Sequence, residues 1–152
     1  MKPAVEVPPL GDGLEFLRLI WAVHHGLEKT SKKMDVRLGV TGPQRLVVRI
    51  VGRFPGIPAG RLAQILHVHP STLTGVLKRL EQRGFIERRP DPRDARRVSL
   101  GLTARGRKLD VAAGTVEGAV NRALETAGSQ QVRAAGRVLK ILAETLERAQ
   151  PL

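Results

Sequence analysis

The 152-residue sequence contains no cysteine. This absence excludes disulfides, thiolate zinc sites, cysteine nucleophiles and thiol redox switches. Aromatic residues make up only 3% of the chain, so the stacking platforms that bind single-stranded nucleic acids have few residues to use. No apolar run approaches the roughly 18 residues that span a bilayer, and residues 1–10 lack the apolar segment of a secretory signal. We therefore expect a cytoplasmic protein with no membrane partner.

Motifs that carry enzymatic chemistry are also missing. The sequence has no His-Glu-x-x-His pair, no Gly-Lys-Ser/Thr phosphate loop and no nucleophile elbow. Its four histidines stand at positions 24, 25, 67 and 69. Adjacent histidines on a helix diverge by about 100°, and no thiolate assists them, so a zinc site is not expected. The sequence predicts a protein that is not an enzyme and holds neither metal nor cofactor.

Positive charge is present in excess and unevenly distributed. Lys and Arg number 26 against 14 Asp and Glu, a net charge of +12. Residues 61–108 alone hold twelve basic and four acidic residues, a balance of +8, while residues 109–152 are neutral. A surface that only kept the protein soluble would carry both signs evenly. The concentration of charge favours a nucleic-acid partner.

Helical patterns begin after a lead-in. Residues 1–13 are rich in proline and glycine and are expected to be flexible. An apolar stripe over residues 14–40 predicts a first helix. Thr41 and Gln44 fit a capping box that opens a second helix, which stops near Phe54. The side of this helix predicted to be exposed carries Arg45, Arg49 and Arg53.

Two short helices joined by a tight turn are predicted next, over residues 59–66 and 70–83. The second has apolar residues at i, i+3, i+4 and i+7, which mark a buried face. Those residues are Leu73, Val76, Leu77 and Leu80. The opposite face is slim and polar. Gly84 then ends the helix, because glycine readily takes a positive φ.

A basic hairpin follows the second short helix. Residues 85–89 and 97–102 read as strands on either side of a long turn at 90–95. We expect Asp91 and Asp94 to stiffen this turn by bonding backbone amides or a neighbouring arginine, leaving a free guanidinium for a narrow minor groove. Two helices, a tight turn and a basic hairpin form a winged helix-turn-helix over residues 41–102.

The polar face of the second short helix suits the major groove of duplex DNA, which admits a slim, hydrogen-bonding helix. The residues assigned to DNA contact are Ser71, Thr72, Thr74, Gly75, Lys78 and Arg79 on the helix, with Arg93, Arg96 and Arg97 on the hairpin. Capping of the first helical turn is the alternative role for Ser71 and Thr72.

The C-terminal third, residues 103–152, reads as two dimerisation helices. Thr103 can cap a helix that runs to Ala127, with Gly114 and Gly118 inside it, and a last helix ends at Ala149. Their apolar seams need a cover, which a second copy can supply. The residues assigned to this contact are Leu14, Leu17, Leu139, Leu142 and Leu146. The alternative is an internal helical hairpin that covers its own seam.

A series of short motifs between Leu62 and Gly106 together resembles the sequence of one protein family. They are Leu62-Ala63, Ser71-Thr72-Leu73-Thr74, Leu77-Lys78-Arg79-Leu80-Glu81, Gly84-Phe85-Ile86, Arg88, Asp91-Pro92-Arg93-Asp94, Arg96, Leu102-Thr103 and Gly106. This stretch resembles the MarR family of winged helix-turn-helix regulators. The resemblance implies a mainly α fold with a small β-hairpin wing, flanked by N- and C-terminal dimerisation helices.

The resemblance also implies a function. Expected is a homodimer that acts as a repressor on a pseudo-palindromic operator, with recognition helices one helical turn, about 34 Å, apart. A small anionic or phenolic effector would sit between the dimerisation helices and the DNA-binding region. Its candidate contacts are Trp21, His24, His25 and Arg49. The absence of cysteine excludes the subgroup that senses peroxides through a thiol. The alternative function is a nonspecific architectural DNA- or RNA-binding protein.

Overall fold

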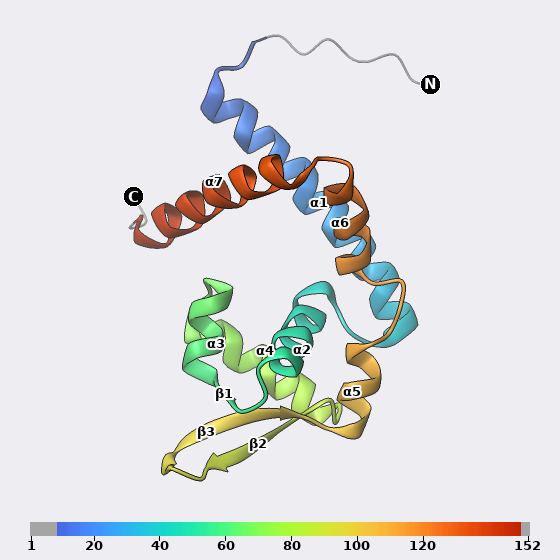
Figure 1. Ribbon diagram of the computed structural model, residues 1–152, viewed down its shortest axis with the longest axis vertical. Coiled ribbons are helices and arrows are strands. Elements are labelled where there is room, and N and C mark those ends of the chain that lie inside the picture. Colours follow the sequence, from blue (N-terminus) through green and yellow to red (C-terminus); the bar gives the residue numbers. More distant parts are fainter. Residues whose placement is uncertain (1–8, 150–152) are drawn as a thin grey trace.

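The computed structural model describes residues 9–149, which form seven helices and one small antiparallel sheet (Figure 1). The elements are α1 (Asp12–Leu38), α2 (Gly42–Arg53), β1 (Ile57–Pro58), α3 (Ala59–Leu66), α4 (Pro70–Gln82), β2 (Ile86–Asp91), β3 (Asp94–Leu102), α5 (Ala104–Asp110), α6 (Val116–Glu125) and α7 (Ser129–Arg148). We call α2 to α5 with the sheet the winged lobe, and α1, α6 and α7 the terminal helices. The predicted fold class, mainly helical with a hairpin wing, is confirmed.

Local capping sets where the helices of the winged lobe begin and end. The Thr41 side chain accepts from the Gln44 amide at 3.4 Å, and the Gln44 side chain accepts from the Thr41 amide at 3.1 Å, which completes the predicted capping box. Thr103 caps α5 in the predicted way, its hydroxyl accepting from the Gly106 amide at 3.0 Å. Gly84 has a φ of +73° and follows the end of α4 as predicted.

A continuous apolar core holds the winged lobe together. Three of the four residues predicted on the buried face of α4 are buried, Leu73, Leu77 and Leu80, and Val76 is half-buried. They pack with Val47, Val48 and Val51 of α2, Leu62 of α3, and Phe85, Ile86 and Leu100 beside or on the sheet. Because this core covers one face of α4 only, the other face is left to solvent.

The hairpin is longer and its turn tighter than the sequence predicts. Strands β2 and β3 pair as far as Asp91 opposite Asp94, which leaves only Pro92 and Arg93 between them. The predicted six-residue turn at 90–95 is therefore too long: β2 runs to Asp91 and β3 begins at Asp94, and the pairing shifts register after Pro90, which lies opposite Val98. Ile57 and Pro58 add a third strand to β3, with Ile57 opposite Leu100. A two-residue strand is too short to show a period in the sequence.

The helix predicted from Thr103 to Ala127 is broken, and that prediction is wrong. Helix α5 ends at Asp110 and α6 begins at Val116. Between them Gly114 has a φ of +67°, and the Thr115 hydroxyl accepts from the Gly118 amide at 3.2 Å to cap α6. The apolar period runs through residues 111–115, but a glycine in a left-handed conformation followed by a threonine cap starts a new helix there. We call residues 111–115 the linker.

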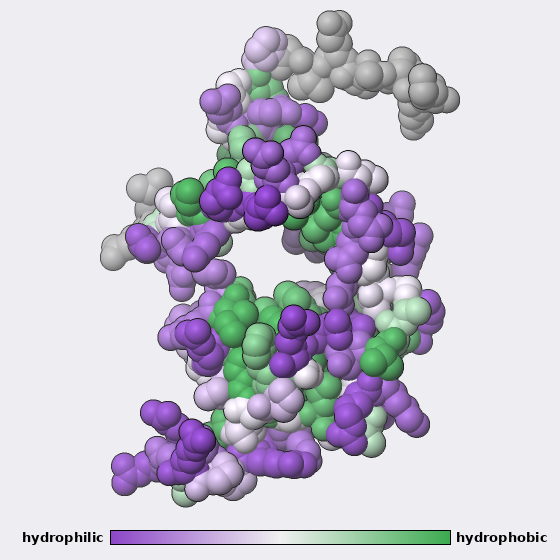
Figure 2. Space-filling view, in the orientation of Figure 1, coloured by the Kyte–Doolittle hydropathy of each residue, from purple (hydrophilic) through white to green (hydrophobic). Residues whose placement is uncertain are grey.

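The terminal helices keep much of their apolar surface uncovered. Neither α6 nor α7 contains a buried residue, and α1 has only Met34. Large apolar side chains are exposed on α1 and α7, among them Leu14, Leu17, Trp21, Leu139, Ile141 and Leu146 (Figure 2). The alternative of an internal hairpin requires that the two C-terminal helices cover each other's apolar residues. Within one chain they do not, because neither contains a buried residue. No helix of residues 9–149 is long and apolar enough to cross a membrane.

Candidate nucleic-acid interface

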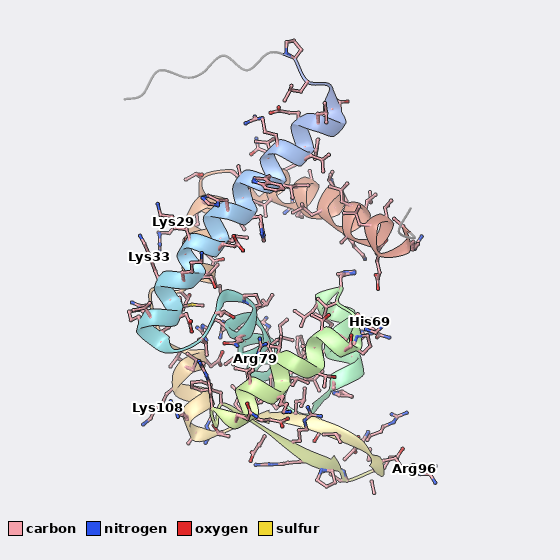
Figure 3. All side chains as sticks on the ribbon, turned by 180° about the vertical axis from the view of Figure 1, so that it is seen from behind. Lys29, Lys33, His69, Arg79, Arg96 and Lys108 are labelled. Carbon is pink, nitrogen blue, oxygen red and sulfur yellow. The ribbon has the colours of Figure 1, made fainter. Side chains whose placement is uncertain are left out.

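Helix α4 crosses the front of the winged lobe in Figure 3, with its polar face outward. All six of its residues assigned to DNA contact are exposed, namely Ser71, Thr72, Thr74, Gly75, Lys78 and Arg79. Their exposure follows from the helical period, since the buried leucines occupy the opposite side. The face is slim as well as polar, because Gly75 has no side chain. A Cβ added to Gly75 would meet nothing within 4 Å. The fold itself therefore does not require a glycine at this position.

Two hydroxyls of this face already hold partners at the start of α4. His69 is the N-cap, and its Nδ1 accepts from the Ser71 amide at 3.2 Å and lies 2.7 Å from the Ser71 hydroxyl. The Thr74 hydroxyl donates to the Pro70 carbonyl at 2.9 Å. Both hydroxyl oxygens keep lone pairs that can accept from base amino groups. Sequence reasoning missed the capping role of His69, because histidine is not among the usual capping residues.

The hairpin tip combines held acids with free arginines. Asp91 accepts from the Arg93 amide at 2.8 Å, and Asp94 accepts from the Arg96 amide at 3.0 Å. Arg97 lies 3.7 Å from Asp94, in an exposed pair. Across the part of the chain that the structure describes, no ion pair involves the side chains of Arg93 or Arg96. The turn is thus stiffened by its own carboxylates, and the Arg96 side chain projects away from the lobe at the hairpin tip (Figure 3).

Two arginines nearer the lobe are paired instead. Arg88 on β2 donates to Glu81 of α4, and Arg89 donates to Glu87 on the same strand. The Arg88 pair ties the hairpin to α4, because each partner belongs to a different element. The orientation of the hairpin relative to α4 is therefore supported by a charged contact as well as by the core.

A cavity of about 750 Å³ lies beside the winged lobe, between α1, α2 and α6. Its lining includes His24, Ser31, Arg45, Arg49, Val116 and Glu117. Of the four residues proposed for an effector, His24 and Arg49 line this cavity and Trp21 and His25 do not. His25 lines a smaller hollow of about 330 Å³ on α1 with three lysines, and Trp21 is 76% exposed.

Both arginines of α2 that line this cavity bond to Asp110. Arg45 is 3% exposed rather than solvated, so its assignment to an exposed side is wrong. It is buried because its guanidinium donates to the Asp110 carbonyl at 2.7 Å, and burial lowers the pKa of Arg45. Arg49 is half-exposed and donates to the Asp110 and Glu117 carboxylates at 2.7 and 2.8 Å, which raises the pKa of Arg49.

Comparison with known proteins agrees with this architecture. The HTH-type transcriptional regulator TtmR of Methylorubrum extorquens is 31% identical over 110 residues, which are 70% of this chain and 56% of that protein. The chain thus spans little more than half the length of TtmR. The organic hydroperoxide resistance transcriptional regulator of Bacillus subtilis is 28% identical over 130 residues, 86% of this chain and 88% of that one.

A solved structure and a family profile complete the comparison. The transcriptional regulator SlyA matches with a TM-score of 0.75 at 25% identity, covering 87% of this chain and 96% of that one. Residues 40–98, from the start of α2 to the middle of β3, match the profile of the MarR family. The polar α4, the hairpin after it and these matches agree: the chain belongs to the MarR family.

Proposed function

We propose that this chain is a sequence-specific transcriptional regulator that binds double-stranded DNA as a homodimer. One observation carries the proposal: a rigid helix exposes a slim polar face, and a stiffened hairpin beside it ends in two arginines without ion-pair partners in the described chain. The major groove admits an α-helix, and a narrow minor groove attracts arginine. The charge of residues 61–108 has the sign that phosphate requires.

In this proposal each part of the interface has its own task. Ser71, Thr72 and Thr74 meet base edges in the major groove, where Gly75 lets the helix approach closely. Lys78 and Arg79, one turn further along α4, contact phosphate or guanine. The hairpin places Arg93 and Arg96, with Arg97 behind them, in the neighbouring minor groove. Asp91 and Asp94 stabilise the hairpin and do not touch DNA.

The uncovered terminal helices support the homodimer. Leu14 and Leu17 of α1 are 60% and 62% exposed, and Leu139 and Leu146 of α7 are 57% and 68% exposed. Leaving such side chains in water forgoes roughly 1.5 to 3 kcal/mol each, so a second copy that covers them is strongly favoured. A twofold dimer would also present two copies of α4 to an inverted repeat.

A small effector is part of the proposal, and we propose repression as the sign of control. The cavity between α1, α2 and α6 offers His24 and the charged Arg49 to an anionic or phenolic compound. The Bacillus subtilis relative is named for organic hydroperoxide resistance. This chain has no cysteine, so a thiol cannot be its sensor. We therefore propose that a compound bound in the cavity releases the operator.

Selection from a random duplex library tests the central proposal. Bound fragments should share an inverted repeat with half-site centres one helical turn apart. The control is the Lys78→Ala variant, which should recover the repeat weakly while its thermal midpoint stays at that of the parent. Recovery of fragments without a shared sequence, or equal binding of RNA, would instead support the alternative of a nonspecific architectural protein.

Thermal unfolding in the presence of benzoates and hydroxybenzoates tests the effector. A compound that binds the folded state raises the midpoint, and a concentration of 100 Kd adds about 2.7 kcal/mol. His24→Ala should lose the rise, because His24 lines the cavity, whereas His25→Ala should keep it. A reporter gene behind the selected operator should then be silent with the protein and active when the compound is added.

A further inference from the structure

Three arginines hold the linker between α5 and α6. Arg37 of α1 donates to the carbonyl oxygens of Ala113 and Gly114. Arg45 of α2 donates to the Asp110 carbonyl at 2.7 Å and to the Ala112 carbonyl at 3.4 Å. The linker connects the winged lobe with the terminal helices (Figure 1). The backbone carbonyls at the end of α5 and in the linker have no partner within a helix. Here they accept from charged guanidinium groups.

The third arginine, Arg49, spans the linker. Its Nη1 donates to Asp110 Oδ1 at 2.7 Å, and its Nε donates to Glu117 Oε2 at 2.8 Å. Asp110 is the last residue of α5, and Glu117 lies in the first turn of α6. One guanidinium on α2 therefore joins the helix before the break to the helix after it. The planar fork of arginine suits this task, because its donors point in fixed directions.

A glycine on α2, Gly52, leaves room for the Asp110 carboxylate. A Cβ on Gly52 would lie 2.7 Å from Asp110 Oδ2, so a glycine here lets the carboxylate approach α2. The Asp110 side chain is only 19% exposed, which shields its pair with Arg49 from solvent more than an ordinary surface pair. The Glu117 side chain, at 42% exposure, is more open. The contact on the Asp110 side is therefore the stronger half.

These contacts lie at the point where α6 leaves the winged lobe. The linker contains Gly114 in a left-handed conformation and would otherwise be free to bend. In the homodimer of the proposed function the terminal helices are paired, so the direction of α6 relative to the lobe sets the separation of the two α4 helices. One base pair adds about 3.4 Å along the DNA axis, so even small changes of this direction alter which half-sites fit.

We propose that Arg49, held by Asp110 and Glu117, is a positioning residue that sets the half-site spacing the dimer accepts. It makes no contact with DNA and acts by fixing the angle at the linker. The inference rests on the proposed function, because spacing has meaning only for a dimer on an inverted repeat. Arg49→Gln and Glu117→Gln should loosen the angle, and Arg49→Lys should restore it only in part, since lysine lacks the fork.

Operators with altered spacing provide the test. The selected inverted repeat is lengthened or shortened by one and two base pairs, and the affinity of each duplex is measured. The parent should prefer its best spacing by about tenfold over the one-pair changes. Arg49→Gln and Glu117→Gln should reduce this preference from about tenfold to about threefold. Their affinity for the duplex with the best spacing should fall by a smaller factor than the preference does. Glu125→Gln, on the same helix and without an ion pair in the described chain, is the matched control.

A distance measurement gives the same answer without DNA. Because the chain has no cysteine, Gln82→Cys places one spin label at the end of α4 in each protomer. The distance between the two labels should be narrowly distributed in the parent and in Glu125→Gln, and broader in Arg49→Gln. Folded variants that keep the parent's spacing preference and distance width overturn this inference alone. A parent that selects no inverted repeat, or that is monomeric, overturns the proposed function and this inference with it.

Discussion

The carbonyl oxygen of Phe85 lies 1.9 Å from the position that a Cβ on Gly106 would occupy. The Thr103 amide donates to this carbonyl at 3.2 Å. This hydrogen bond joins the residue before β2 to the residue between β3 and α5. Gly106 is in the first turn of α5 and is buried. The absence of a side chain at this point lets α5 close against the start of the hairpin.

Gly106→Ala should therefore destabilise the fold. A methyl group cannot share this space with a backbone oxygen, and overpacking of this kind costs about 3 kcal/mol. Urea denaturation should show a lower midpoint with an unchanged slope. Gly60→Ala, in helix α3 with nothing within 4 Å of the added Cβ, is the control and should leave stability unchanged or slightly raised. Equal midpoints for both variants would contradict the close approach.

Local chemistry made the starts of α2 and α5 predictable. The capping box of Thr41 with Gln44 and the Thr103 cap each involve residues within one turn, so their spacing in the sequence is enough to predict them. The exposed face of α4 is predictable for a similar reason, because the positions of Leu73 and Leu77 determine which side the core takes.

Contacts between distant segments were not predictable. The sequence places Arg45 on a solvated side, yet it is buried because carbonyls 65 and 67 positions later accept from it. Those carbonyls are free because α5 ends at Asp110, and the apolar period of the sequence continues past this end into α6. The cap at His69 escapes notice for a different reason: an imidazole can accept, but its sequence context does not show whether it does.

Gly75→Ala should separate stability from DNA binding. The added methyl has nothing within 4 Å and replaces a glycine inside α4, so unfolding should become harder by up to about 1 kcal/mol. The proposed interface brings DNA close to this position, so operator affinity should fall about tenfold or more. Thermal unfolding and a binding titration on one preparation measure both. Gly60→Ala in α3 is the matched control, because it also lies in a helix with no neighbour within 4 Å and is assigned neither to DNA nor to the dimer contact, and it should leave affinity unchanged.

Arg93→Ala and Arg96→Ala should reduce the salt dependence of operator binding. Each phosphate that a basic side chain neutralises adds about 0.9 to the magnitude of the negative slope of log affinity against log salt. One arginine lost from each protomer should therefore reduce this magnitude by about 1.8. Arg133→Ala on α7 removes the same charge away from the winged lobe and should change the slope little. An equal effect of all three substitutions would mean that net charge matters and the tip does not.

Leu139→Asp combined with Leu142→Asp should dissociate the homodimer. Leu139 is 57% exposed and Leu142 half-buried on α7, a helix without a buried residue in the single chain. A carboxylate placed in an apolar interface must be desolvated without a partner, at a cost of several kcal/mol. Sedimentation should show the parent at twice the chain mass and the double variant at the mass of one chain.

The control for this experiment lies between the two leucines. Lys140→Asp changes the charge of the same turn, but Lys140 faces Glu144 at 3.9 Å with its side chain 68% exposed. It should leave the dimer intact, because its substitution removes only a weak exposed pair. The winged lobe has its own core, so the double variant should keep its helical circular dichroism signal while losing operator affinity. A parent that sediments as a monomer, or a double variant that stays dimeric, would place the contact between copies elsewhere than on α7.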